Sequence, residues 1–217
     1  LGYERITRVA VDEQGRMRVE AFKAAMQAAK GKPIIAIAQA GHLNSGAFDN
    51  LGEIAAAAHA AGAWLHVDGA FGLWARVAPD RAHLARGIEH ADSWSVDGHK
   101  WLQTPYDAAY AIVRHRDAHY EAMKIAASYL PAGGDRHPSD YVPELSRRAR
   151  GFATWATIKS LGREGIAAMV SRHCALARRM AERLGAEPGV EILNEVVLNQ
   201  VSVRLGADID PARADAL

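Results

Sequence analysis

Apolar residues recur along this chain at helical spacing in some segments and as short continuous runs in others. Residues 18–30 place Val19, Phe22, Met26 and Ala29 on one helical face, which predicts an amphipathic helix. These two patterns alternate along most of the chain. The alternation is the first indication of the fold class.

A second helix is predicted over residues 51–61, because a capping signal precedes it. Asn50 has a side chain that can accept a hydrogen bond from the first turn, and Glu53 completes a capping box. Further along, residues 146–162 and 164–185 repeat apolar positions at helical spacing. We expect two long helices there.

Short apolar runs predict the strands. They lie at residues 6–11, 32–41, 63–69, 92–101 and 108–115. The run at 32–41 is nearly continuous, as expected of a strand that is covered on both faces. Strands that alternate with helices indicate an α/β fold with a mainly parallel sheet. Residues 190–205 contain two more strand-like runs, so we expect a large domain over 1–187 and the start of a small C-terminal domain over 188–217.

Composition excludes several classes of protein. The 26 Lys and Arg residues against 25 Asp and Glu residues leave a net charge of +1, which argues against nucleic acid or acidic lipid as a partner. No apolar run approaches the roughly 20 residues that span a bilayer, so no membrane segment is expected. The single cysteine, Cys174, suits a reducing compartment, and we expect a cytoplasmic protein. The chain opens on Leu1 rather than Met, which suggests a fragment.

Two residues whose side chains could take part in catalysis follow predicted strands closely. Asp68 and Lys100 each come within a few residues of a strand end, and ligands gather at the carboxyl edge of such sheets. A lysine after a strand is most often a solvated surface residue, and Asp68-Gly69 is an ordinary turn dipeptide. A lysine that condenses with an aldehyde and a carboxylate that holds a proton on a pyridine nitrogen together describe a pyridoxal phosphate site. No set of metal ligands is predicted.

The surroundings of these residues resemble a known family. HVDGAFGLWA (66–75) followed by ADSWSVDGHKWL (91–102) is similar to the group II pyridoxal-phosphate decarboxylases, which show His-Val-Asp-Ala-Ala and Asn-Pro-His-Lys-Trp at the same separation. The resemblance extends through NSGAFDN (44–50), SYL (128–130) and ELSRRARGFATW (144–155). It implies the large domain of a fold-type I pyridoxal-phosphate enzyme.

The resemblance implies a role for each matching residue. Lys100 matches the lysine that binds the cofactor as an aldimine, and Asp68 matches the partner of the pyridinium nitrogen. Ala70 matches the small residue that packs on the ring. His99 matches the histidine close to the cofactor, and Asn44 falls where the family has a threonine.

Two residues before His99 depart from the family's pattern. Asp97 replaces the asparagine near the phosphate, and Gly98 replaces the proline. A carboxylate beside a phosphate is unfavourable unless it is held away or caps a backbone amide. Asp97 and Ser95 are therefore both candidate cofactor-binding residues, with Ser95 as a substitute donor to the phosphate. Tyr129, at the start of the irregular segment 129–144, matches the mobile-loop tyrosine that gives a proton after carbon dioxide leaves.

The implied activity is decarboxylation of an amino-acid substrate with pyridoxal 5′-phosphate, in a homodimer whose subunits share active sites. The same lysine and aspartate also serve aminotransferases, aldehyde synthases and carbon–carbon lyases on this scaffold. A truncated, non-catalytic partner of a complete subunit is a third interpretation. In the family, the loop that cups the phosphate and the aromatic residue stacked on the pyridine precede the segment matched here.

Overall fold

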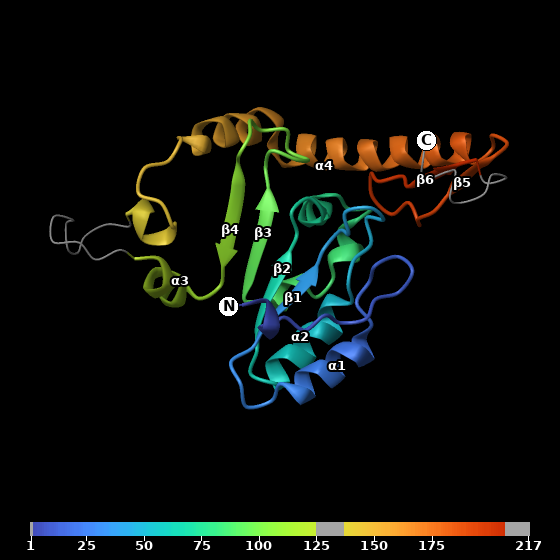
Figure 1. Ribbon diagram of the computed structural model, residues 1–217. Helices are drawn as coiled ribbons and strands as arrows, with labels where there is room; N and C mark the ends of the chain where they lie inside the picture. Colours follow the sequence, from blue (N-terminus) through green and yellow to red (C-terminus); the bar gives the residue numbers. More distant parts are fainter. Residues whose placement is uncertain (1, 125–136, 207–217) are drawn as a thin grey trace.

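The computed structural model describes residues 2–124 and 137–206 and has a four-stranded sheet at its centre (Figure 1). The strands follow chain order as β1 (Ile35–Gln39), β2 (Trp64–Asp68), β3 (Ser93–Asp97) and β4 (Ala109–Val113). β1, β2 and β3 are parallel, and β4 is antiparallel to β3. The expected α/β fold with a mainly parallel sheet is confirmed.

The two early helices form where the sequence predicts them. α1 (Val19–Ala28) and α2 (Leu51–Ala60) contact each other, and α2 also contacts β1 and β2. Asn50 Oδ1 accepts a hydrogen bond from the backbone N–H of Glu53 at 3.4 Å, and its Nδ2 donates to the Glu53 carboxylate at 2.5 Å. This capping pair satisfies a backbone donor of the first turn and fixes where α2 begins.

The two faces of the sheet differ in burial, most clearly at β1. The buried face is made of small and branched side chains, namely Ala36, Ala38, Leu65 and Val67. On the opposite face, Ile35 and Ile37 are each 61% exposed. The prediction that 32–41 is covered on both faces is therefore wrong for these residues, because α1 and α2 pack on one side only.

The strand predicted over 6–11 does not form. Val11 makes an isolated antiparallel bridge with Met17, and a tight turn at Asp12 joins the two. A β-strand needs a neighbouring backbone along its length, and the structure supplies one only at Val11. The alternating pattern at 6–11 marks an extended segment instead.

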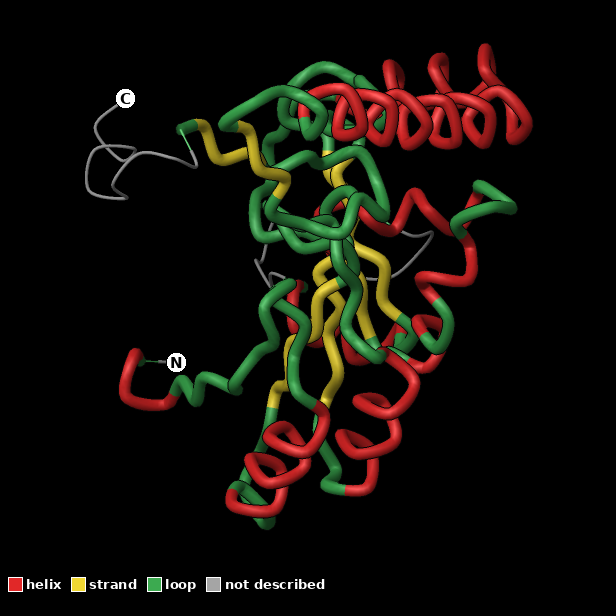
Figure 2. The backbone as a smooth tube through the Cα atoms, turned by 90° about the vertical axis from the view of Figure 1, so that its right-hand side faces the viewer, coloured by secondary structure: helices red, strands yellow, loops and turns green. Residues whose placement is uncertain are grey.

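A long helix, α4 (Arg150–Leu184), lies at the end of the sheet toward which the parallel strands point (Figures 1 and 2). Its backbone leaves helical geometry at Gly162, where φ is 63°, a left-handed value that glycine adopts without strain. The two helices predicted over 146–162 and 164–185 meet at this break. The second half supplies the buried residues Ile166, Val170, Cys174 and Ala177.

The remaining elements are short. They are α3 (Arg116–Met123), β5 (Val190–Ile192), β6 (Val203–Leu205) and the 3-10 helices η1 (Tyr3–Arg5), η2 (Gly72–Val77), η3 (Ala82–Ala85), η4 (Ile88–His90) and η5 (Pro138–Tyr141). β5 and β6 pair with each other in a separate antiparallel sheet. Leu198, between them, is fully buried in the main core. The predicted boundary between a large domain and a small C-terminal domain at residue 188 stays a prediction. No helix in the described ranges is both long and apolar enough to cross a membrane.

Asp92 links three elements at the amino end of β3. Its carboxylate accepts from the Leu65 backbone N–H at 2.8 Å and lies 3.2 Å from His59 Nε2 and 3.3 Å from His115 Nε2. Burial would raise the pKa of Asp92. The backbone hydrogen bond and the two histidines outweigh it, so the pKa lies below its usual value.

Candidate active site

The strand register brings four of the expected site residues together. Asp68 lies opposite Ser95 on the neighbouring parallel strand, and Asp97 is two residues further along on the same face. The pairing continues past β2, because Gly69 N donates to Ser95 O at 2.9 Å and Asp97 N donates to Ala70 O at 2.7 Å. Asp68 Oδ1 also accepts from Ala70 N at 3.0 Å. Asp68, Ala70, Ser95 and Asp97 therefore form one edge.

Lys100 and His99 join this edge through Asp97. Lys100 Nζ lies 2.8 Å from Asp97 Oδ2, and His99 Nε2 lies 3.6 Å from the same oxygen. His99 Nδ1 is 2.8 Å from the carbonyl oxygen of Ala108, and its ring stacks against Tyr106 with centroids 4.3 Å apart. We call Asp68, Ala70, Ser95, Asp97, His99 and Lys100 the strand-end cluster.

A hollow adjoins the cluster. Its volume is about 360 Å³, and it is lined by Phe71, Lys100, Trp101, Gln103, His173, Asn199 and Gln200. Trp101 Nε1 donates to His173 Nδ1 at 3.1 Å, which ties the turn after Lys100 to α4. The volume lies within the usual range for small-molecule sites. A larger hollow of about 730 Å³ runs along α4, and the strand-end cluster does not line it.

His66 belongs to the same face and was missed by the sequence analysis. Its Nδ1 is 2.8 Å from Ser93 Oγ, and its Nε2 is 3.4 Å from Ser95 Oγ. Trp64 Nε1 donates to Ser93 Oγ at 2.8 Å, which leaves the Ser93 hydroxyl free to donate to Nδ1. Burial lowers the pKa of His66, while the Asp68 carboxylate opposes that effect. The sequence carried a signal for this position, because side chains two residues apart on a strand lie on the same face and His66 precedes Asp68 by two residues.

A neutral His66 with its proton on Nε2 donates to Ser95 Oγ. The hydroxyl hydrogen of Ser95 is then available for another acceptor. This arrangement suits the expectation that Ser95 donates to a phosphate.

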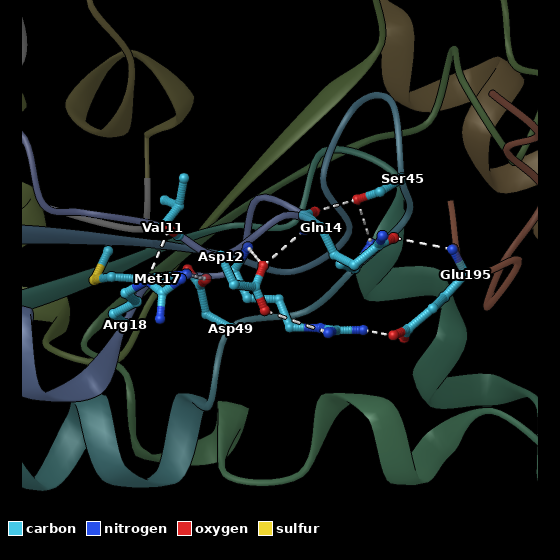
Figure 3. Close-up of polar contacts among 10 residues, drawn as sticks. Val11, Asp12, Gln14, Met17, Arg18, Ser45, Asp49 and Glu195 are labelled. Atoms are coloured by element: carbon cyan, nitrogen blue, oxygen red, sulfur yellow. Dashed lines mark hydrogen bonds and ion pairs between the residues drawn. The ribbon is translucent and has the colours of Figure 1, made fainter. Parts of the chain in front are cut away.

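Asn44 lies on an exposed turn, and none of its described hydrogen bonds is to the strand-end cluster. Its carbonyl oxygen accepts from Ser202 Oγ at 2.8 Å. The next residue, Ser45, donates to Gln14 O at 2.5 Å, and Gln14 Oε1 accepts from Glu195 N at 2.9 Å (Figure 3). The described hydrogen bonds of this turn therefore reach the segments around Gln14 and Glu195.

Tyr129 lies outside the described residues. The groups that are described fit a pyridoxal group by their chemistry. Lys100 supplies a primary amine, Asp68 supplies a carboxylate on the same edge, and Ala70 places a small side chain between them along the chain. The amine can bond the aldehyde of a pyridoxal group, the carboxylate can pair with its pyridine nitrogen, and the small side chain leaves room for its flat ring.

Curated aromatic-L-amino-acid decarboxylases are similar to this chain over most of its length. The chain is 32% identical over 212 residues to an aromatic-L-amino-acid decarboxylase of Drosophila lebanonensis, covering 94% of this chain and 52% of the relative. It is 30% identical over 210 residues to the enzyme of the same name from Bacillus atrophaeus, covering 93% of this chain and 44% of the relative. The chain thus spans about half the length of the curated relatives it matches.

Solved structures share the fold. Mouse CSAD in its apo form matches with a TM-score of 0.85 at 26% identity, over 94% of this chain and 44% of that one. The 4-hydroxyphenylacetaldehyde synthase of Rhodiola rosea matches with a TM-score of 0.86 at 23% identity, over 100% of this chain and 46% of that one, and shows the fold alone. These neighbours confirm the expected fold class.

A family model matches the chain as well. The model for the pyridoxal-dependent decarboxylase conserved domain matches residues 2–206, which is nearly the whole chain. The chain therefore belongs to the pyridoxal-dependent decarboxylase family, whose cofactor is pyridoxal 5′-phosphate.

Proposed function

We propose that the full-length protein decarboxylates an amino acid, with pyridoxal 5′-phosphate held covalently by Lys100. The observation that carries this proposal is the strand-end cluster, in which Lys100 and Asp68 are joined through the paired backbones of β2 and β3. Family membership supports the reaction class. The names of the curated relatives make aromatic amino acids the first substrates to test.

Three residues of the cluster, and Tyr129, have a proposed part in this reaction. The bound cofactor supplies an electron sink for the charge left when carbon dioxide departs. Lys100 Nζ would hold the cofactor through its aldehyde group. Asp68 keeps a proton on the pyridine nitrogen, and Ala70 leaves room for the ring. Tyr129 is proposed to protonate the product carbon.

Ser95 is the proposed donor to the phosphate. Its hydroxyl accepts from His66 in the arrangement above and has a hydrogen to give. Asp97 carries a negative charge and is unsuited to that contact. Its carboxylate is already engaged by Lys100.

The test is product analysis with the full-length protein. Carbon dioxide and amine should form from at least one amino acid of a panel that begins with Trp, Tyr and Phe. The Lys100→Ala variant should form neither. Aldehyde and ammonia in place of amine would favour an aldehyde synthase, and transfer of the amino group would favour an aminotransferase. A full-length protein that binds the cofactor and acts on no amino acid would contradict the proposal.

We also propose that the protein is a homodimer with shared active sites. The first half of α4 carries a stripe of exposed apolar side chains at spacings of three, namely Phe152, Trp155, Ile158 and Leu161. Phe152 is 77% exposed and Trp155 is 62% exposed, which is costly for residues of this size in a free surface. Sedimentation of the full-length protein should give a dimer, and Trp155→Lys should weaken it. The cytoplasmic location stays a prediction.

A further inference from the structure

Lys100 lies between two aromatic residues whose rings are each held by a polar contact. On one side, His99 Nδ1 is 2.8 Å from the carbonyl oxygen of Ala108. On the other side, Trp101 Nε1 donates to His173 Nδ1 at 3.1 Å. The first contact is local, whereas the second comes from α4, 72 residues further along the chain. The position of Lys100 therefore depends on a contact between two distant segments.

The turn that carries Lys100 needs such an anchor, because its backbone is not relaxed. Gln103 has a φ of 60°, a left-handed value that residues other than glycine adopt at a cost. The backbone N–H of Gln103 donates to Lys100 O at 3.2 Å, so the strained residue closes the turn directly on Lys100. A conformation of this kind persists only where the surrounding contacts determine it.

The Trp101 side chain can hold the turn in place because it is almost fully buried. It is 4% exposed and belongs to the core cluster that includes Val170 and Cys174 of α4. An indole N–H donates and never accepts, so a buried one needs an acceptor. His173 Nδ1 is that acceptor, and an indole left without it would destabilise the buried position of Trp101.

His173 can accept because its ring is uncharged at neutral pH. Burial lowers the pKa of His173, and the charge of Arg172 lowers it further. Nδ1 receives the indole hydrogen, so the hydrogen of the neutral ring is on Nε2. Nε2 lies 3.4 Å from Arg172 Nη2, which is itself a donor, and this contact does not compete for Nδ1.

We propose that His173 is a positioning residue, which fixes the turn that carries Lys100 through its hydrogen bond with Trp101 and thereby favours the bond between Lys100 and the cofactor. All three side chains line the smaller hollow of the candidate site. The inference rests on the proposed function, since it takes Lys100 to be the lysine that bonds the cofactor. In that bond, the amine nitrogen joins the aldehyde carbon and the aldehyde oxygen leaves as water. A misplaced Lys100 should weaken this bond and leave the cofactor's other contacts unchanged.

Two ligands separate the position of Lys100 from the rest of the site. Pyridoxal 5′-phosphate has the aldehyde, whereas pyridoxine 5′-phosphate has an alcohol in its place and cannot bond the amine in this way. Titration of the full-length, cofactor-free protein at neutral pH gives a Kd for each ligand. The ratio of the two Kd values measures the preference for the aldehyde. A general disturbance of the fold should weaken both ligands and leave this preference near the parent value.

His173→Leu removes the acceptor and should lower the preference about tenfold, the size expected when a buried donor loses its partner. His173→Asn keeps an oxygen on Cγ where histidine has Nδ1, so its preference should stay within about twofold of the parent. Trp101→Phe removes the donor and should lower the preference as His173→Leu does. The double variant should be no worse than either single variant, because both break the same hydrogen bond.

Trp94→Phe is the matched control. Trp94 Nε1 donates to Ile88 O at 2.8 Å, so this variant also loses an indole hydrogen bond, but within β3 rather than in the turn after Lys100. Its preference should equal that of the parent, and urea denaturation checks that each variant folds. Lys100→Ala should abolish the preference. If it does not, the proposed function fails, and the test of His173 is separate from that outcome.

Three results would overturn the proposal. The first is a parent-like preference in His173→Leu, and the second is a loss in His173→Asn as large as in His173→Leu. The third is a set of additive losses in the double variant. If His173→Leu does not fold, Trp101→Phe decides the matter, and a parent-like preference in that variant overturns the proposal.

Discussion

Replacing Gly98 by alanine should destabilise the protein, because a side chain at this position meets Tyr110. A Cβ built on Gly98 lies 2.0 Å from the Tyr110 hydroxyl oxygen and 2.7 Å from Thr104 Oγ1. Gly98 is not among the glycines with a positive φ, so the backbone itself accepts alanine. The steric contact alone determines the outcome.

The magnitude follows from what must move. Ordinary van der Waals contacts of a Cβ are 3.4–4 Å, so the Tyr110 hydroxyl has to be displaced. That displacement breaks its hydrogen bond to Thr154 Oγ1, which is 3.1 Å long. Overpacking costs about 1–3 kcal/mol, and a lost hydrogen bond costs about 0.5–1.5 kcal/mol. We expect Gly98→Ala to lower the free energy of unfolding by about 2–4 kcal/mol.

Urea denaturation of the parent and the variant measures this loss. Gly151→Ala is the matched control, since a Cβ there has nothing within 4 Å and lies in α4, where alanine should be neutral or stabilising. In a double-mutant cycle, Tyr110→Leu should remove most of the penalty of Gly98→Ala. A neutral Gly98→Ala, or an equal penalty in the Tyr110→Leu background, would refute the reasoning.

Three further predictions concern named side chains. Borohydride reduction of the loaded full-length enzyme should place the pyridoxyl group on Lys100, and a label on Lys159 instead would contradict its assignment. Asp68→Ala leaves a partly buried charge unpaired, which costs about 3–5 kcal/mol. Cofactor affinity measured by titration should therefore fall at least about a hundredfold. An affinity equal to the parent's would contradict the role of Asp68 as the partner of the pyridine nitrogen. The pKa of Asp92 is depressed in the folded state, so its contribution is present above the usual value of 3.8 and is lost as pH falls through the folded pKa. Acid denaturation should show this loss in the parent, and Asp92→Asn should flatten it.

The sequence predicted the central elements of the fold because their signals are local. α2 begins at the residue that its capping pair selects, and α4 breaks at the glycine between the two predicted helices. The exposure of Ile35 and Ile37 was not predictable, because a run of apolar residues does not say how many faces have neighbours. The strand expected over 6–11 failed for the same reason, since only Val11 finds a partner.

The site shows the same division between local and non-local information. The positions of Asp68 and Lys100 after their strands place them at one edge through a general property of parallel sheets. No role was assigned to His66 from the sequence, because its hydrogen bonds are to Ser93 and Ser95 on the neighbouring strand. Asn44 was assigned by resemblance. Its backbone N–H donates locally to His42 Nδ1, but its carbonyl oxygen accepts from Ser202, 158 residues away in the sequence, and that contact has no local signal.

The sequence has Asp97 and Gly98 where the family has Asn-Pro, and contacts in the structure accommodate each of these two residues. The carboxylate of Asp97 is tolerable at a buried strand end because Lys100 and His99 face it. Because Gly98 has no side chain, the Tyr110 hydroxyl can occupy the space beside it and hydrogen-bond Thr154 in α4. A proline at 98 would displace Tyr110, and it would also move the backbone that aims Asp97 at Lys100. A proline would also lack the N–H that Gly98 donates to Ala108 O at 2.9 Å, so restoring the proline should weaken the turn that carries His99 and Lys100.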